Sequence, residues 1–125
     1  MPKTSQQTAS HVEDLGVMER RYEELGGYTV GFETFRQDAD AAPLMKGLPD
    51  DRCQSPHWGY VVSGRLTMTY ADREEIYEAG DAYYAPPGHT PAVAAGTEVI
   101  EFSPTEEYGR RMEVIGRNLA ILQEA

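Results

Sequence analysis

Short runs of apolar residues, interrupted by turns that contain glycine or proline, recur along most of the chain. The run 58–70 is broken only at Ser63-Gly64, which predicts two strands that meet at a turn. Later runs cover 74–78, 82–85 and 98–102. A strand therefore arrives about every eight to twelve residues, a spacing typical of an all-β sandwich or barrel.

The first half of the chain predicts a hairpin followed by a long connection. Runs at 17–24 and 28–35 flank Leu25-Gly26-Gly27, and adjacent glycines supply the positive φ angles of a tight hairpin turn. A helix over 17–25 is the alternative, because that run is also rich in helix formers. Residues 37–52 carry two prolines and show no period, which predicts a surface connection.

The C-terminal segment has the pattern of a helix over residues 104–123. Ser103 is placed to cap it, Pro104 to occupy its first position and Glu106 to complete a capping box. Apolar residues then recur at helical spacing, and they are Tyr108, Met112, Ile115, Leu119 and Leu122. We expect this stripe to pack on the outside of the barrel, with dimerisation as the alternative.

The length of 125 residues indicates one domain. Residues 1–12 are polar and rich in Ser, Thr and Gln, so we expect a flexible leader there and a single domain over 13–125. The leader lacks the apolar core of a signal peptide, and no apolar run is long enough to span a membrane. Cys53 is the one cysteine, so the chain forms no internal disulfide, and we expect a cytoplasmic protein.

The net charge limits the classes of molecule that the protein is expected to bind. Twenty-one acidic and 11 basic residues give a formal net charge of −10. Such a field repels phosphate backbones and anionic lipids, so we expect neither nucleic acid nor a membrane as a partner. A neutral or cationic small molecule remains compatible with it.

Gly64, Gly80, Pro86 and Gly88 stand at spacings by which the segment 53–104 resembles the cupin superfamily. The first cupin motif ends in a glycine, here Gly64, seven residues after a metal-binding glutamate, a position that His57 holds in this chain. The two histidines that precede that glutamate in the family fall at Asp51 and Cys53.

The second cupin motif keeps its turn residues, which are Gly80, Pro86 and Gly88. Its histidine position holds Pro91, and His89 stands two residues earlier. The resemblance implies a small cupin-type barrel, a double-stranded β-helix or jelly roll, with its motifs over about 51–104. A chain that resembles cupins is also expected to be a homodimer.

The candidate metal ligands are His57, His89, Cys53 and Asp51. Alternation along a strand gives Asp51, Cys53 and His57 the same parity, and the resemblance implies that this parity faces the barrel interior. Imidazole and thiolate donors favour a divalent zinc, iron, copper or nickel ion, and no organic cofactor is expected. The simpler interpretations are a hydrogen-bonded His57, an inert Cys53 and a solvated turn residue at Asp51. Glu101 is a weaker candidate, for which a solvent-facing position is the simpler interpretation.

These residues predict a metal-dependent enzyme that acts on a small organic molecule in the barrel. We expect His57, His89 and the phenol of Tyr83 to take part in catalysis, with a histidine as general base if no metal binds. Dioxygenase, isomerase, lyase and decarboxylase chemistry all remain open. The alternative function is a small-ligand-binding or sensing cupin without catalysis or metal.

Overall fold

The computed structural model describes the backbone of residues 2–124 and the side chains of residues 2–121. In chain order its elements are β1 (His11–Asp14), β2 (Met18–Leu25), β3 (Tyr28–Phe35), β4 (Ala39–Asp40), η1 (Ala42–Met45), η2 (Pro49–Asp51), β5 (His57–Ser63), β6 (Arg65–Thr69), β7 (Glu74–Glu78), β8 (Ala82–Ala85), β9 (Thr90–Val93), β10 (Glu98–Pro104) and α1 (Thr105–Glu124).

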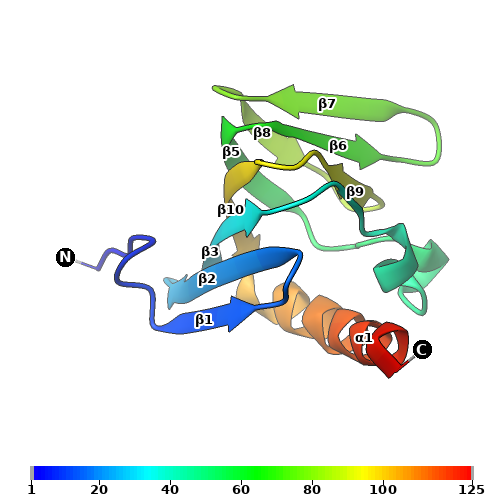
Figure 1. Ribbon diagram of the computed structural model, residues 1–125, viewed down its shortest axis with the longest axis horizontal. Helices are drawn as coiled ribbons and strands as arrows, with labels where there is room; N and C mark the ends of the chain where they lie inside the picture. Colours follow the sequence, from blue (N-terminus) through cyan, green and yellow to red (C-terminus); the bar gives the residue numbers. More distant parts are fainter. Residues whose placement is uncertain (1, 125) are drawn as a thin grey trace.

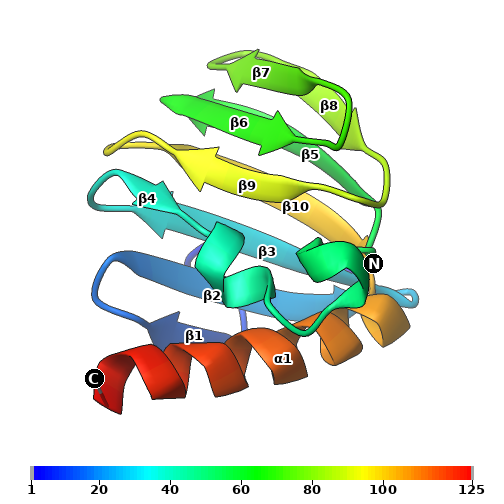
Figure 2. The ribbon, with the colours of Figure 1, turned by 90° about the vertical axis from the view of Figure 1, so that its right-hand side faces the viewer.

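The strands form two antiparallel sheets that face each other. One has the order β1-β2-β3-β10-β5-β8 and the other β4-β9-β6-β7. Both ribbon views place β7 at one end of the molecule and α1 at the other, where the helix runs beside β1 and β2 (Figures 1 and 2). The expected all-β jelly-roll barrel with a C-terminal helix is confirmed.

The hairpin predicted around the double glycine is present. β2 and β3 pair down to Leu25 opposite Tyr28, and Gly26 and Gly27 have φ angles of 58° and 86°. The positive φ angles confirm the turn, so the helical alternative for the first run is wrong. β1 pairs with β2, which places the expected end of the leader at residue 12 inside a strand.

Apolar side chains from both sheets form the core. Its buried members are Val61, Leu66, Met68, Tyr70, Tyr83, Ala85 and Val99. Tyr83 lies directly against Gly59 of the neighbouring strand, and a Cβ at Gly59 would stand 2.5 Å from the tyrosine hydroxyl oxygen. The absence of a side chain at Gly59 therefore makes room for the Tyr83 ring.

The connection over residues 37–52 is more ordered than the sequence indicates. β4 pairs with β9, and η1 contacts α1 and buries Met45. Residues 50 and 51 both adopt left-handed backbone conformations, with φ angles of 58° and 54°. This part of the chain closes one side of the barrel interior and is not a plain surface loop (Figure 2).

The C-terminal helix is confirmed, but two details differ from expectation. Ser103 belongs to β10, which pairs with β3 as far as Pro104, so the serine side chain turns inward and is free for other contacts. Met112, Ile115 and Leu119 line an internal cavity and do not pack on the outside of the barrel. The side chain of Leu122 lies outside the described residues.

None of the described helical residues forms a segment long and apolar enough to cross a membrane.

Candidate metal centre

Three of the four predicted ligands come together in the barrel. Cys53, His57 and His89 are at most 1% exposed, and one ligating atom of each lies within 4.8 Å of the other two. A short bridge joins Cys53 to His89, in which the Cys53 amide donates to the His89 carbonyl at 2.8 Å. His57 begins β5 four residues after the cysteine. Backbone pairing thus brings the two motifs to one point.

Both imidazoles hold their Nδ1 atoms in hydrogen bonds. His89 Nδ1 lies 2.8 Å from the Pro86 carbonyl oxygen, which only accepts, so Nδ1 carries the proton. His57 Nδ1 lies 2.7 Å from Ser103 Oγ, and its Nε2 accepts from an arginine. Each Nε2 therefore carries a lone pair, and that of His89 is buried without a hydrogen-bond partner in the described part of the chain.

Burial keeps both histidines neutral. Desolvation, together with Arg111 and His89, places the pKa of His57 well below its usual value of 6.5. Desolvation lowers the pKa of His89 to about 4, although its bond to Pro86 opposes this. A neutral imidazole is the form that coordinates a metal. Both imidazoles therefore hold the protonation state that ligation requires near neutral pH.

Arg111 of α1 caps the cluster. Its Nη1 donates to His57 Nε2 at 2.8 Å and lies 3.8 Å from Cys53 Sγ. Burial opposes the charge, but Cys53 and Glu101 raise the pKa of Arg111, so the guanidinium stays cationic. Arg111 is not among the residues that the sequence predicts for the site. The sequence feature that indicates Arg111 is its position on the apolar face of the helix, three residues after Tyr108 and four before Ile115.

Glu101 faces the interior, so a solvent-facing position is wrong. It is 8% exposed, and its Oε1 lies 3.8 Å from His57 Nδ1. The reason is the register of β10, in which Val99, Glu101 and Ser103 are buried and the residues between them are not. Burial, with Glu33 nearby, raises the pKa of Glu101 well above 4.5. Protonation of this carboxyl is therefore favoured.

Tyr83 contacts the site indirectly, through a hydrogen bond to Glu101. Its hydroxyl donates to Glu101 Oε1 at 3.3 Å, and its ring stacks on Tyr77 with the centroids 4.5 Å apart. Burial and the neighbouring carboxyl raise the pKa of Tyr83, so the phenol keeps its proton. The predicted pocket phenol thus lies behind the carboxyl of Glu101.

Asp51 lies apart from the three buried ligands. It is exposed, and its Oδ1 accepts a hydrogen bond from the Gly47 amide at 3.0 Å. The strand alternation used to place Asp51 does not apply to it, because η2 and its left-handed backbone interrupt the extended chain before Cys53. Asp51 behaves as a turn residue.

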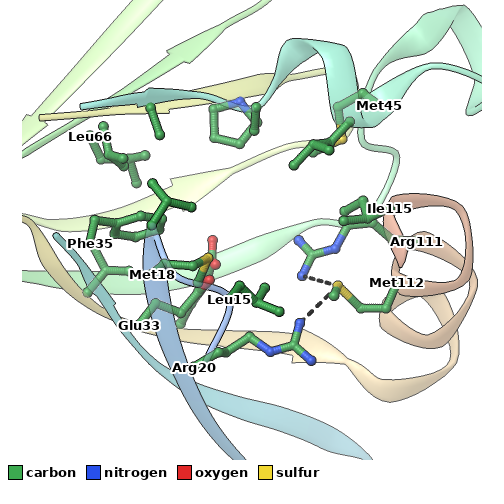
Figure 3. Close-up of a pocket in the computed structure, with 18 of the residues that line it drawn as sticks. Leu15, Met18, Arg20, Glu33, Phe35, Met45, Leu66, Arg111, Met112 and Ile115 are labelled. Atoms are coloured by element: carbon green, nitrogen blue, oxygen red, sulfur yellow. Dashed lines mark hydrogen bonds between the residues drawn. The ribbon is translucent and has the colours of Figure 1, made fainter. Parts of the chain in front are cut away.

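Of the three clustered residues, His57 lines a cavity of about 150 Å³ between the sheets, which is closed on one side by η1 and α1. Most of its wall is apolar, and a close-up shows Leu66, Phe35 and Met18 on the side away from α1 (Figure 3). Its polar lining groups are His57, Glu101, Glu33, Arg20 and Arg111. This combination of an apolar wall and a few polar groups is typical of a small-molecule pocket.

Two facing antiparallel sheets, around a cavity that receives side chains from two consecutive motifs, define a small jelly-roll barrel protein. Residues 52–102 match the family model described as the cupin domain. The match covers about two fifths of the chain, and together with the fold it supports the assignment to the cupin superfamily that the motifs indicated.

Solved structures share this fold at low sequence identity. An RmlC-like cupin from Shewanella frigidimarina has a TM-score of 0.54 and 19% identity, over 81% of this chain and 88% of its own. KdgF from a Halomonas species has a TM-score of 0.52 and 22% identity, over 75% and 86%. A Rhizobium leguminosarum protein of unknown function has a TM-score of 0.56 and 18% identity, over 82% and 95%. No curated protein matches the chain.

Proposed function

We propose that this protein is a metal-dependent cupin enzyme that acts on a small organic molecule in its barrel cavity. The observation that carries the proposal is the buried set of Cys53, His57 and His89, whose ligating atoms lie within 4.8 Å of one another. The unpartnered, buried Nε2 of His89 supports it, because a buried acceptor without a partner is costly unless a ligand satisfies it.

The donor set fits a transition metal. One sulfur and two imidazole nitrogens favour zinc, iron, copper or nickel over magnesium. Three protein ligands leave a coordination position for a substrate, and the metal would supply Lewis-acid or redox chemistry there. The Pro86 carbonyl and the Ser103 hydroxyl already orient the two imidazoles, as partners of metal-ligating histidines commonly do.

Glu101 gives the site a group that can carry a proton, and the apolar lining of the cavity excludes water. Glu101 favours its protonated form and accepts from the Tyr83 hydroxyl, so a proton can be held at the cavity wall beside His57. The surrounding apolar side chains keep bulk water from the reacting groups. We assign Glu101 the role of proton donor or acceptor, with Tyr83 positioning it.

A second function is favoured by one contact. Arg111 donates to the same His57 Nε2 that a metal would occupy, which is the arrangement of a metal-free pocket. The alternative is therefore a small-ligand-binding cupin in which the guanidinium takes the place of the ion.

Metal content separates the two functions. We expect the untagged protein to hold about one equivalent of zinc, iron, copper or nickel by elemental analysis, and His57→Ala and His89→Ala each to lose most of it. His11→Ala is the matched control, because His11 is exposed on β1 and should leave the content unchanged. A folded, metal-free parent that does not take up added metal would overturn the enzyme in favour of the binding protein.

We also propose that two copies associate through the outer face of the six-stranded sheet. Five large side chains lie together there, each 41% to 49% exposed, and they are Trp58, Tyr60, Val62, Tyr84 and Phe102. Trp58 pairs with both Phe102 and Tyr84 across the strands, so the patch is continuous. None of the five is charged, so two copies that each carry a net charge of −10 meet there with the least repulsion.

Light scattering tests this association. The parent is expected to have the mass of a dimer, and Tyr60→Glu the mass of a monomer, because a buried carboxylate opposes association. Ile76→Glu is the matched control, since Ile76 is 53% exposed on the other sheet. A monomeric parent, or a Tyr60→Glu protein that remains dimeric, would refute this interface.

A further inference from the structure

One end of the cavity is rich in hydrogen-bond donors and poor in acceptors. Arg20 of β2 and Arg111 of α1 reach it from opposite sides and converge on the sulfur of Met112 (Figure 3). Arg20 Nη1 lies 3.0 Å from that sulfur and Arg111 Nη2 3.8 Å. A thioether is a weak acceptor, so it satisfies neither guanidinium well.

Three buried donor atoms at or beside this end have no hydrogen-bond partner in the described part of the chain. The Nε atoms of Arg20 and Arg111 are buried without a hydrogen-bond partner among the described residues, and so is the Tyr108 hydroxyl. The Tyr108 ring lies near both guanidinium groups, with its centroid 5.2 Å and 4.8 Å from their Cζ atoms. Buried donors without partners are rare in folded proteins, so this cluster calls for an acceptor from outside the chain.

Arg111 is the guanidinium that can receive a carboxylate from a ligand. Arg20 is paired with Glu13 at 2.6 Å, whereas none of the ion pairs found among the described residues includes Arg111. Glu33 lines the same cavity and would repel a second negative charge on a ligand. A ligand with one carboxylate, placed beside Arg111, is therefore expected to bind more tightly than a ligand with two.

The rest of the cavity requires an apolar body. Its wall includes Phe35, Leu66, Val99, Ile115 and Leu119. The volume is about 150 Å³, and an apolar cavity of that size accommodates a molecule about as large as benzene. A polar or much larger ligand would leave buried groups unsatisfied or would not enter.

From these observations we infer that the cavity takes a small monocarboxylate with an apolar body of about benzene size, whose carboxylate Arg111 and Arg20 receive. Arg111 and Arg20 are thus specificity-determining residues, and the two-pronged guanidinium matches carboxylate geometry. The inference deepens the proposed function and rests on it only in assuming that the pocket takes a small organic molecule.

Calorimetric titration with three isosteric probes tests the ligand class. Benzoate, benzamide and benzylamine have similar shapes but are anionic, neutral and cationic, and each is titrated into chelator-treated protein and into zinc-loaded protein. We expect benzoate to bind at least about tenfold more tightly than benzamide in both forms, and benzylamine most weakly. Phthalate, with its second carboxylate, is expected to bind more weakly than benzoate.

Variants on α1 show whether Arg111 is responsible. Arg111→Met is expected to abolish the preference for benzoate over benzamide, and Arg111→Lys to retain part of it because the charge remains. Arg117→Met is the matched control, since Arg117 is exposed on the same helix. Circular dichroism and thermal melting identify any variant that fails to fold, for which Arg20→Met supplies the corresponding measurement.

The outcomes separate this inference from the metal proposal. Equal binding of benzoate and benzamide, tighter binding of benzylamine, or no binding of any probe overturns the monocarboxylate, even if the protein holds a metal. A benzoate preference that depends on Arg111 in a protein that takes up no metal supports the monocarboxylate and overturns the metal-dependent enzyme.

Discussion

Arg111→Met is expected to bind zinc at least about tenfold more tightly than the parent protein. The guanidinium donates to His57 Nε2 at 2.8 Å and lies 3.8 Å from Cys53 Sγ, so it uses one donor atom and adds a positive charge beside the others. Two unit charges 4 Å apart repel by about 4 kcal/mol in a partly buried site, and a divalent ion doubles that value before the arginine moves away. Methionine keeps most of the packing volume and removes the charge.

Competition with a chromophoric chelator measures this change in zinc affinity. Arg117→Met, a variant of an exposed arginine on the same helix, should match the parent. An Arg111→Met affinity equal to or weaker than that of the parent would mean that the arginine does not oppose the ion. The metal centre would then have to form with the guanidinium in place.

The metal-free protein is expected to lose stability as the pH falls from about 6.5 to about 4. The pKa of His89 is near 6.5 in the unfolded chain and about 4 in the folded one, so the unfolded state binds more protons over this interval. The contribution of His89 is complete above pH 6.5 and is lost by pH 4, a change of about 3 kcal/mol. His57 acts with the same sign, because its pKa is also lowered.

Urea unfolding between pH 7.5 and pH 4.5, with chelator present, measures the effect. Glu101 acts with the opposite sign, because its pKa is raised and acid favours its folded, protonated form. His89→Gln should flatten the profile, whereas His11→Gln should not, since His11 is exposed. A His89→Gln profile as steep as that of the parent would show that His89 is not held neutral by burial.

The barrel could be predicted from residues that control the backbone. Gly64 has a φ angle of 82° and Gly88 one of 100°, conformations that glycine adopts without strain, so their positions mark turns whatever the side chains around them do. The same local logic placed the hairpin at Gly26-Gly27. These features depend on neighbouring residues alone, and the sequence displays them directly.

The site was only partly predictable, because its geometry depends on distant contacts. Cys53, His57 and His89 follow from the motif positions, but Arg111 enters from a helix more than 50 residues away in sequence from His57. Asp51 was misplaced because strand parity does not extend through the left-handed residues of η2. Glu101 required the register of β10, in which only structure shows which face is buried.

Ser103 and Arg111 hold opposite nitrogens of one imidazole. Ser103 lies 2.7 Å from His57 Nδ1, and Arg111 donates to His57 Nε2 from the second turn of the helix that begins two residues after the serine. A single continuous segment, 103–111, therefore contacts both ring nitrogens of His57. A tilt of that segment would lengthen both hydrogen bonds at the same time. The orientation and the basicity of the His57 imidazole would therefore change together.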